Sequence, residues 1–103
     1  MAKELSHVVE RFLRYFKVDT QSVHNCTAIP TTEKQKDLAR MLVKELEELG
    51  AADIRLDDAG CVYATIPANC DVKAPVVGFI AHMDTTPDAS GTNVTPRIIE
   101  NYD

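Results

Sequence analysis

The sequence lacks the features that mark several classes of protein. None of its apolar runs approaches the roughly 18–20 residues of a membrane-spanning helix. Its lysines and arginines are not grouped, and the formal net charge is −5. Binding to nucleic acid depends on grouped basic side chains, so we expect neither a nucleic acid nor a membrane as partner. The first residues mix charged and apolar side chains at helical spacing, from which we expect no signal peptide.

Two common catalytic arrangements are missing as well. The four glycines are scattered and form no Gly-x-Gly-x-x-Gly loop for a phosphate. No serine or cysteine lies in a recognisable nucleophile motif. The cysteines number three, without a Cys-x-x-Cys pair: Cys26, Cys61 and Cys70. An odd number without pairing favours a reducing compartment over a disulfide scaffold, so we expect a cytoplasmic protein.

Hydrophobic residues make up 45% of the 103 residues, which suits one folded unit with a modest core. Residues 3–17 place apolar side chains at the i, i+3, i+4, i+7 spacing of an amphipathic helix. A second helix is predicted from a capping box formed by Thr32 and Gln35 to a stop at Gly50. Its acidic residues are expected to face water rather than bind metal: Glu45, Glu47 and Glu48.

Three β-strands are predicted after the helices. Residues 54–66 have the pattern of a β-hairpin around a turn at 57–60. Residues 76–81 are apolar without alternation, as in a central strand covered on both faces. The order of elements indicates an α/β fold with helices packed on a sheet. Since a central strand needs neighbours on both sides and only one hairpin is available, we expect the beginning of a larger domain.

His82 and Asp84 follow this apolar strand directly. Residues at i and i+2 of a strand point to the same side, and ligand sites in open α/β sheets gather at the carboxyl ends of strands. Imidazole is the commonest transition-metal ligand, and Asp84 is placed to orient it. In the competing interpretation the pair only caps a turn. His7, within the first helix, and His24, in a loop, are not expected to be ligands.

Several stretches resemble a known family. The first is the run from Phe79 to Asp88, FIAHMDTTPD, which closely resembles the first metal-site motif of the peptidase T family of dinuclear zinc exopeptidases. Five further stretches resemble landmarks of that family and occur along the chain in the family's order. They are RFLRY at 11–15, DTQS at 19–22, PTTE at 30–33, ATIPAN at 64–69 and IENY at 99–102.

The resemblance implies a fold, a reaction and two site residues. Residues 1–103 would be the N-terminal part of a helix–sheet–helix catalytic domain, with the rest of that domain and a lid domain absent. His82 would bind the first of two zinc ions, and Asp84 would be the catalytic-site aspartate that orients an imidazole. The family removes the N-terminal residue from tripeptides. Because the other ligands and the general base would lie beyond Asp103, the implied fragment is inactive by itself.

Two alternatives remain open from the sequence. The parent protein could be another exopeptidase or a deacylase of the same zinc superfamily, since substrate choice depends on residues that are not in the chain. The chain could also be a stand-alone binding or structural module without catalysis. An excised sheet would have open strand edges and exposed apolar surface through which it could self-associate.

Overall fold

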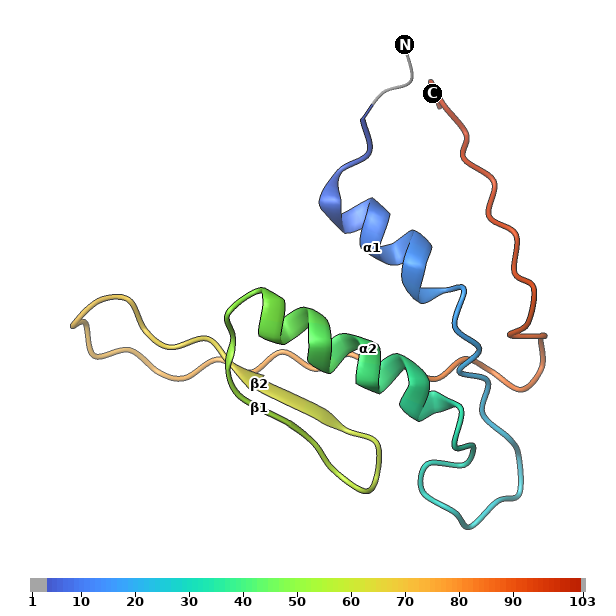
Figure 1. Ribbon diagram of the computed structural model, residues 1–103, viewed down its shortest axis with the longest axis horizontal. Coiled ribbons are helices and arrows are strands. Elements are labelled where there is room, and N and C mark those ends of the chain that lie inside the picture. The colour runs from blue at the N-terminus through green and yellow to red at the C-terminus, as the bar shows by residue number, and fades with distance from the viewer. Residues whose placement is uncertain (1–3, 103) are drawn as a thin grey trace.

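A computed structural model describes residues 4–102. Two helices, α1 (His7–Tyr15) and α2 (Gln35–Glu48), precede an antiparallel hairpin of strands β1 (Ala52–Leu56) and β2 (Val62–Thr65). Helix α2 lies along the hairpin, and α1 lies to one side of them (Figure 1). Residues 66–102 form a long extended segment that runs around these elements. The predicted mixed α/β arrangement is confirmed. Neither helix is long and apolar enough to cross a membrane.

Helix α1 is shorter than predicted, at His7–Tyr15 rather than 3–17, of which residue 3 lies outside the described part. None of its residues is buried, and Val8 and Phe12 are largely exposed. A short helix has little stability in water unless its apolar face is packed against a neighbour. The apolar face of α1 is uncovered over most of its length, which explains why residues 4–6 and 16–17 are not part of the helix.

The two ends of helix α2 differ in how well the sequence predicted them. The predicted capping box is wrong, because Lys34 is the N-cap and no side chain among the described residues caps the first turn. The Thr32 hydroxyl oxygen accepts the Gln35 side-chain amide at 3.0 Å, and the hydroxyl donates to the Gln21 carbonyl oxygen at 2.8 Å. The predicted stop at Gly50 is confirmed: its φ is 78°, and the Ala51 N–H donates to the Leu46 carbonyl at 3.0 Å. A glycine in the left-handed conformation, followed by a residue whose N–H donates to a carbonyl of the last helical turn, is the Schellman motif.

The predicted hairpin at 54–66 is confirmed and starts two residues earlier. Arg55 pairs with Tyr63 and Leu56 with Val62, with a bulge between Ala52 and Arg55. In the turn the Cys61 N–H donates to the Asp57 carboxylate at 2.8 Å. Such side-chain bonds to the backbone explain why this turn closes the two strands in one register.

The predicted buried strand at 76–81 is not formed within the described residues. The segment is extended, but it belongs to no strand, and Val76, Phe79 and Ile80 are fully or almost fully exposed. A strand forms only where its backbone N–H and C=O groups meet those of a neighbouring strand. Within residues 4–102 the hairpin does not pair with this segment, so its apolar pattern has no sheet to join.

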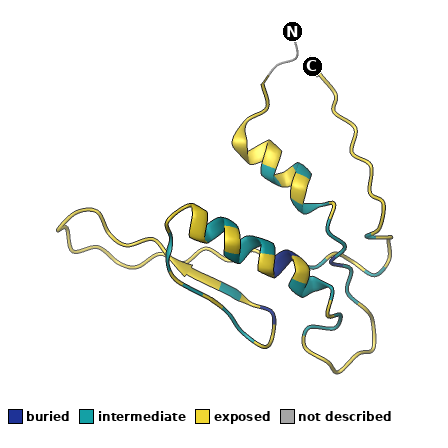
Figure 2. Cartoon of the chain, viewed as in Figure 1, coloured by how far each residue is buried: buried dark blue, intermediate teal, exposed yellow. Residues whose placement is uncertain are grey.

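The chain exposes much more surface than a compact protein of its size. Its accessible area is 8910 Å², against the roughly 5,800 Å² typical of a folded monomer of this mass. Its radius of gyration is 16.8 Å, against about 13 Å for a compact domain of similar length. Among residues 4–102 the buried apolar residues are Leu38 and Ala39, in the stretch of α2 that is dark blue in Figure 2. Large apolar surfaces of this chain are therefore uncovered.

Candidate metal centre and its supporting loop

The structure places His82 and Asp84 in direct contact. Nδ1 of the His82 imidazole lies 3.1 Å from a carboxylate oxygen of Asp84 and 2.9 Å from its backbone carbonyl oxygen. The two residues lie at the start of the loop that directly follows the extended segment 76–81. Both side chains are thus on the same side of the backbone, as their i, i+2 spacing indicates.

The contacts of Nδ1 determine the tautomer of a neutral His82. Both of its neighbours, the carbonyl oxygen and the carboxylate, only accept hydrogen bonds, so Nδ1 must carry the proton. Nε2 then has a free lone pair, and the side chain is 86% exposed. A metal ligand needs this arrangement, in which one ring nitrogen is held by a carboxylate and the other is free to bind.

These residues fit one part of a zinc site. The donor chemistry is suitable, because an imidazole with an unprotonated Nε2 is a common zinc ligand. Zinc sites in proteins use three or four protein ligands. Among residues 4–102 no group of three or more His, Cys, Asp or Glu side chains could hold a metal ion. The described residues therefore offer one imidazole suited to bind zinc and a carboxylate that orients it, but not the three or four ligands of a complete site.

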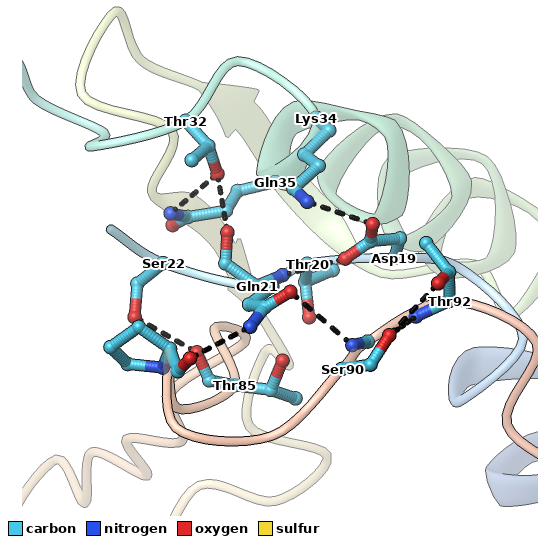
Figure 3. A network of polar contacts seen from close by, with 12 residues as sticks. Asp19, Thr20, Gln21, Ser22, Thr32, Lys34, Gln35, Thr85, Ser90 and Thr92 are labelled. Atoms are coloured by element: carbon cyan, nitrogen blue, oxygen red, sulfur yellow. Dashed lines mark hydrogen bonds and ion pairs between the residues drawn. The ribbon is translucent and has the colours of Figure 1, made fainter. Parts of the chain in front are cut away.

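The loop that carries Asp84 is held by a short segment from far earlier in the chain, residues 19–22 (Figure 3). Thr20 is only 3% exposed, and its hydroxyl donates to the Met83 carbonyl oxygen at 2.8 Å. The backbone carbonyl of Thr20 accepts the Thr85 N–H at 3.2 Å, and the Ser22 N–H donates to the Thr85 carbonyl at 2.9 Å. These two backbone bonds form a single parallel β-bridge next to Asp84.

Gln21 holds the next part of the same loop. Its side-chain amide nitrogen donates to the carbonyl oxygens of Pro87, at 3.0 Å, and Ala89, at 2.8 Å. Its amide oxygen accepts the Gly91 N–H at 3.4 Å (Figure 3 shows this side chain at the centre of the network). One side chain thus bonds to three backbone groups of a loop that contains no helix or strand.

Asp19 fixes the segment that makes these contacts. One carboxylate oxygen accepts the Gln21 N–H at 3.0 Å, and the other pairs with the Lys34 ammonium at 2.7 Å. The Lys34 bond, and then the Gln21 bond, lower the pKa of Asp19 below its ordinary value. A Cβ at Gly91 would lie 2.5 Å from this carboxylate. The loop can therefore approach Asp19 this closely only with glycine at position 91.

An open hollow of about 500 Å³ adjoins the candidate site. His82 and Asp84 border it together with apolar side chains of α1 and its C-cap, of α2 and of the loop: Phe12, Phe16, Leu38, Met83 and Val94. Phe12 and Phe16 contact each other with ring centroids 5.9 Å apart. The imidazole and carboxylate therefore lie at the rim of a largely apolar surface.

The other two histidines lie in exposed ion-pair contacts. His7 is 3.4 Å from Glu10 on the same helix, and His24 is 3.5 Å from Asp88 in the loop after the candidate site. Among the described residues neither contact includes a third side chain that could bind a metal ion, and the interpretation that these two histidines are not metal ligands stays a prediction. The contact between His24 and Asp88 was not predicted, because the two residues are 64 positions apart.

One acidic residue of α2, Glu45, does not face water as predicted. The Glu45 side chain is only 15% exposed and binds Tyr15 and Arg14 of α1. The Tyr15 hydroxyl, followed by Arg14, lowers the pKa of Glu45. Sequence periodicity alone missed this contact because it joins two helices, and only their arrangement in space brings the groups together.

The structure also adds residues to which the sequence assigned no role. Thr20, Gln21 and Ser22 lie in the stretch DTQS, which resembled a family landmark but contains no histidine or pair of carboxylates. Their role is visible in the hydrogen bonds to the loop after His82, which span more than 60 residues of sequence. No spacing rule within the stretch could have identified them as the support of the site.

Comparison with known proteins places the chain beside one class of enzyme: over nearly its whole length it is similar to bacterial peptidases. The relatives are named peptidase T. The chain is 52% identical over 99 residues to the one from Clostridium botulinum (strain Langeland), which covers 96% of the chain and 24% of the relative. Over 96 residues it is 53% identical to the one from Geobacillus kaustophilus, with 93% and 23% covered.

A third relative, peptidase T of Clostridium acetobutylicum, is 50% identical over 99 residues, which cover 96% of the chain and 24% of the relative. No family model matches the chain. The resemblance to peptidase T is thus confirmed, and it extends to a part of these proteins only. The chain spans about a quarter of the length of the curated relatives it matches.

Proposed function

We propose that residues 1–103 are the N-terminal part of the catalytic domain of a cytoplasmic, zinc-dependent aminopeptidase that removes the N-terminal residue from tripeptides. The observation that carries the proposal is the His82–Asp84 contact, which lies within a chain about half identical to proteins named peptidase T. The uncovered apolar segment 76–81, directly before His82, supports the assignment to a larger domain, because a central strand needs further strands beside it.

In this function His82 is a zinc ligand through Nε2, and Asp84 keeps the proton on Nδ1 and the ring in one orientation. Two zinc ions, when bound, supply Lewis-acid chemistry for peptide hydrolysis. The remaining ligands and the general base come from residues outside this chain. Residues 1–103 alone therefore do not hydrolyse peptides, because one imidazole and one carboxylate do not make a complete site.

The test compares His82→Ala with His7→Ala in the full-length protein. His7 is a matched control, because it is an exposed histidine on α1 with only a surface contact to Glu10. We expect His82→Ala to lower kcat/KM for a tripeptide by about a thousandfold or more and to reduce bound zinc. His7→Ala should keep both. A His82→Ala enzyme with full activity and full zinc content would reject the proposal.

A substrate panel separates the proposed activity from its alternatives. Tripeptides, dipeptides and N-acylated amino acids are offered to the wild-type full-length protein in the presence of zinc. Preference for tripeptides with a free amino terminus supports the proposal. Preference for acylated amino acids would indicate a deacylase, and cleavage of dipeptides alone would indicate another exopeptidase.

Zinc titration of the 103-residue chain tests the remaining alternative, a stand-alone module. Followed by calorimetry, the chain should show no tight, stoichiometric site. A tight site together with a cooperative unfolding transition that zinc raises would show that the chain has a complete site of its own.

A further inference from the structure

Three consecutive residues provide most of the hydrogen bonds that hold the loop after His82. Thr20 bonds to Met83 and Thr85, the residues on either side of Asp84. Ser22 donates to the Thr85 carbonyl oxygen with both its N–H and its hydroxyl, the latter at 2.8 Å. Gln21 continues the contacts to the backbone from Pro87 to Gly91. The bonds therefore begin at the carbonyl between His82 and Asp84 and extend along the loop.

We propose that Thr20 and Gln21 are positioning residues, which fix the loop backbone so that the Asp84 carboxylate holds the His82 ring in its Nδ1–H tautomer. This inference rests on the proposed function, because it assigns these two residues to the same site. It extends that function from the pair of site residues to the segment that makes their geometry possible.

The environment of His82 shows why such support is needed. The imidazole is 86% exposed, so packing does not restrict its ring. The backbone around Asp84 has no ladder except the bridge between Gln21 and Thr85. Both acceptors of the His82 Nδ1–H belong to Asp84, so the orientation of the ring follows that of the Asp84 backbone and carboxylate. Displacements of about 1 Å in an active site can cost a hundredfold in rate.

Thr20 is suited to this role by its burial. It is the buried polar residue among those the structure describes, and its hydroxyl and carbonyl are both used on the loop. Removing the hydroxyl leaves the Met83 carbonyl without its donor next to His82 and Asp84. A lost partner at a buried polar group weakens the local structure more than the loss of an exposed hydrogen bond.

Gln21 is suited by its chemistry. Its amide nitrogen has two N–H groups and donates to two carbonyl oxygens, while its oxygen accepts an N–H. A glutamate has the same shape but no donor, and its charge would face the carbonyl oxygens of Pro87 and Ala89. Gln21→Glu therefore disturbs the loop while it leaves the volume of the side chain unchanged.

The experiment uses the full-length protein with Thr20→Val, Thr20→Ser and the control Thr65→Val. Valine keeps the shape of threonine without its hydroxyl, serine keeps the hydroxyl, and Thr65 is an exposed residue at the end of β2. We expect Thr20→Val to lower kcat for a tripeptide at least tenfold, with KM changed less than threefold. In a competition with a chelator, it should also weaken zinc binding by roughly 10–100-fold, as is typical when a residue that supports a metal ligand is lost. Thr20→Ser should recover most of both losses.

A second readout does not depend on activity or metal. In zinc-free full-length protein labelled with ¹⁵N at histidine, long-range ¹H–¹⁵N spectra show which ring nitrogen carries the proton. We expect His82 to be an Nδ1–H tautomer in wild type and Thr65→Val, and a mixture in Thr20→Val and Gln21→Glu. Gln21 is partly exposed, so its variant provides the measurement if Thr20→Val does not fold.

The outcomes separate the two proposals. A wild-type protein without peptidase activity rejects the proposed function, while the tautomer of His82 still tests the positioning of its ring. Thr20→Val and Gln21→Glu proteins with the wild-type tautomer and wild-type kcat overturn the inference. A fall in kcat that only matches a fall in the folded fraction, with no rescue by serine, also overturns it.

Discussion

The β1–β2 hairpin and the segment 76–81 both have an extended backbone and a sequence that predicts β-strands, but only the hairpin forms them. The hairpin is paired, in register, and covered by α2. The segment 76–81 is extended and exposed. The hairpin strands need only a turn of a few residues to meet each other. The segment 76–81 needs neighbouring strands that the described residues do not provide. The hairpin therefore forms from contacts that are local in the sequence, whereas this segment depends on contacts with distant residues.

The largest expected effect comes from a charge within the unpaired segment. Ile80→Lys should leave the 103-residue chain within about 0.5 kcal/mol of its original stability, because the Ile80 side chain is fully exposed. In the full-length protein, where we propose that this strand is central and covered, it should cost about 3 kcal/mol or more. Thermal unfolding of both lengths measures the difference. The same variant should reduce self-association of the short chain.

Val72→Lys is the matched control for this comparison. Val72 is exposed too, but it lies between β2 and the segment 76–81, in residues that form no helix or strand. It should have little effect at either length. An Ile80→Lys full-length protein as stable as the Val72→Lys protein would show that 76–81 stays uncovered. The absence of partner strands would then no longer explain why the segment differs from the hairpin.

The next largest effect concerns the packed region. Leu38→Ala removes one of the two buried apolar side chains and should destabilise the full-length protein by about 2–3 kcal/mol, the lower part of the usual range. Leu49→Ala, at the exposed end of α2, should cost less than about 1 kcal/mol. Urea denaturation measures both. Equal effects for the two leucines would mean that the packing of α2 around Leu38 does not stabilise the protein.

The smallest effect depends on pH and on the contact between the helices. The Tyr15 hydroxyl and then Arg14 lower the folded-state pKa of Glu45 below the ordinary 4.5. A depressed carboxylate pKa stabilises the fold above the unfolded-state pKa, and this stability is lost as the pH falls through the folded-state pKa. Wild type should exceed Glu45→Gln in stability by about 0.5–1 kcal/mol at pH 7 and lose that advantage as the pH falls below 4.5 and through the lowered folded-state pKa. Melting temperatures measured from pH 7 downward provide the test. A constant difference between the two proteins would contradict the assignment.

Much of the local structure could be predicted from the sequence, and particular residues show the limit. Gly50 ends α2 as predicted, because a glycine after an amphipathic run can adopt the left-handed conformation that stops a helix. The capping box at Thr32 did not form, because the helix begins only at Gln35 and the Thr32 hydroxyl oxygen accepts the Gln35 side-chain amide instead of a backbone N–H. The hydroxyl also donates to the carbonyl of Gln21, eleven residues away, a contact that the fold provides and no local pattern shows.

The candidate site divides in the same way. The sequence by itself determined α2, the hairpin and the pairing of His82 with Asp84, because i, i+2 spacing places two side chains on one face of an extended backbone. Only the tertiary structure decided that Thr20 and Gln21 hold the loop and that Glu45 joins two helices. These contacts join residues 30 or more positions apart. A local pattern fixes the direction of a side chain, whereas its distant partner depends on how the whole chain is arranged.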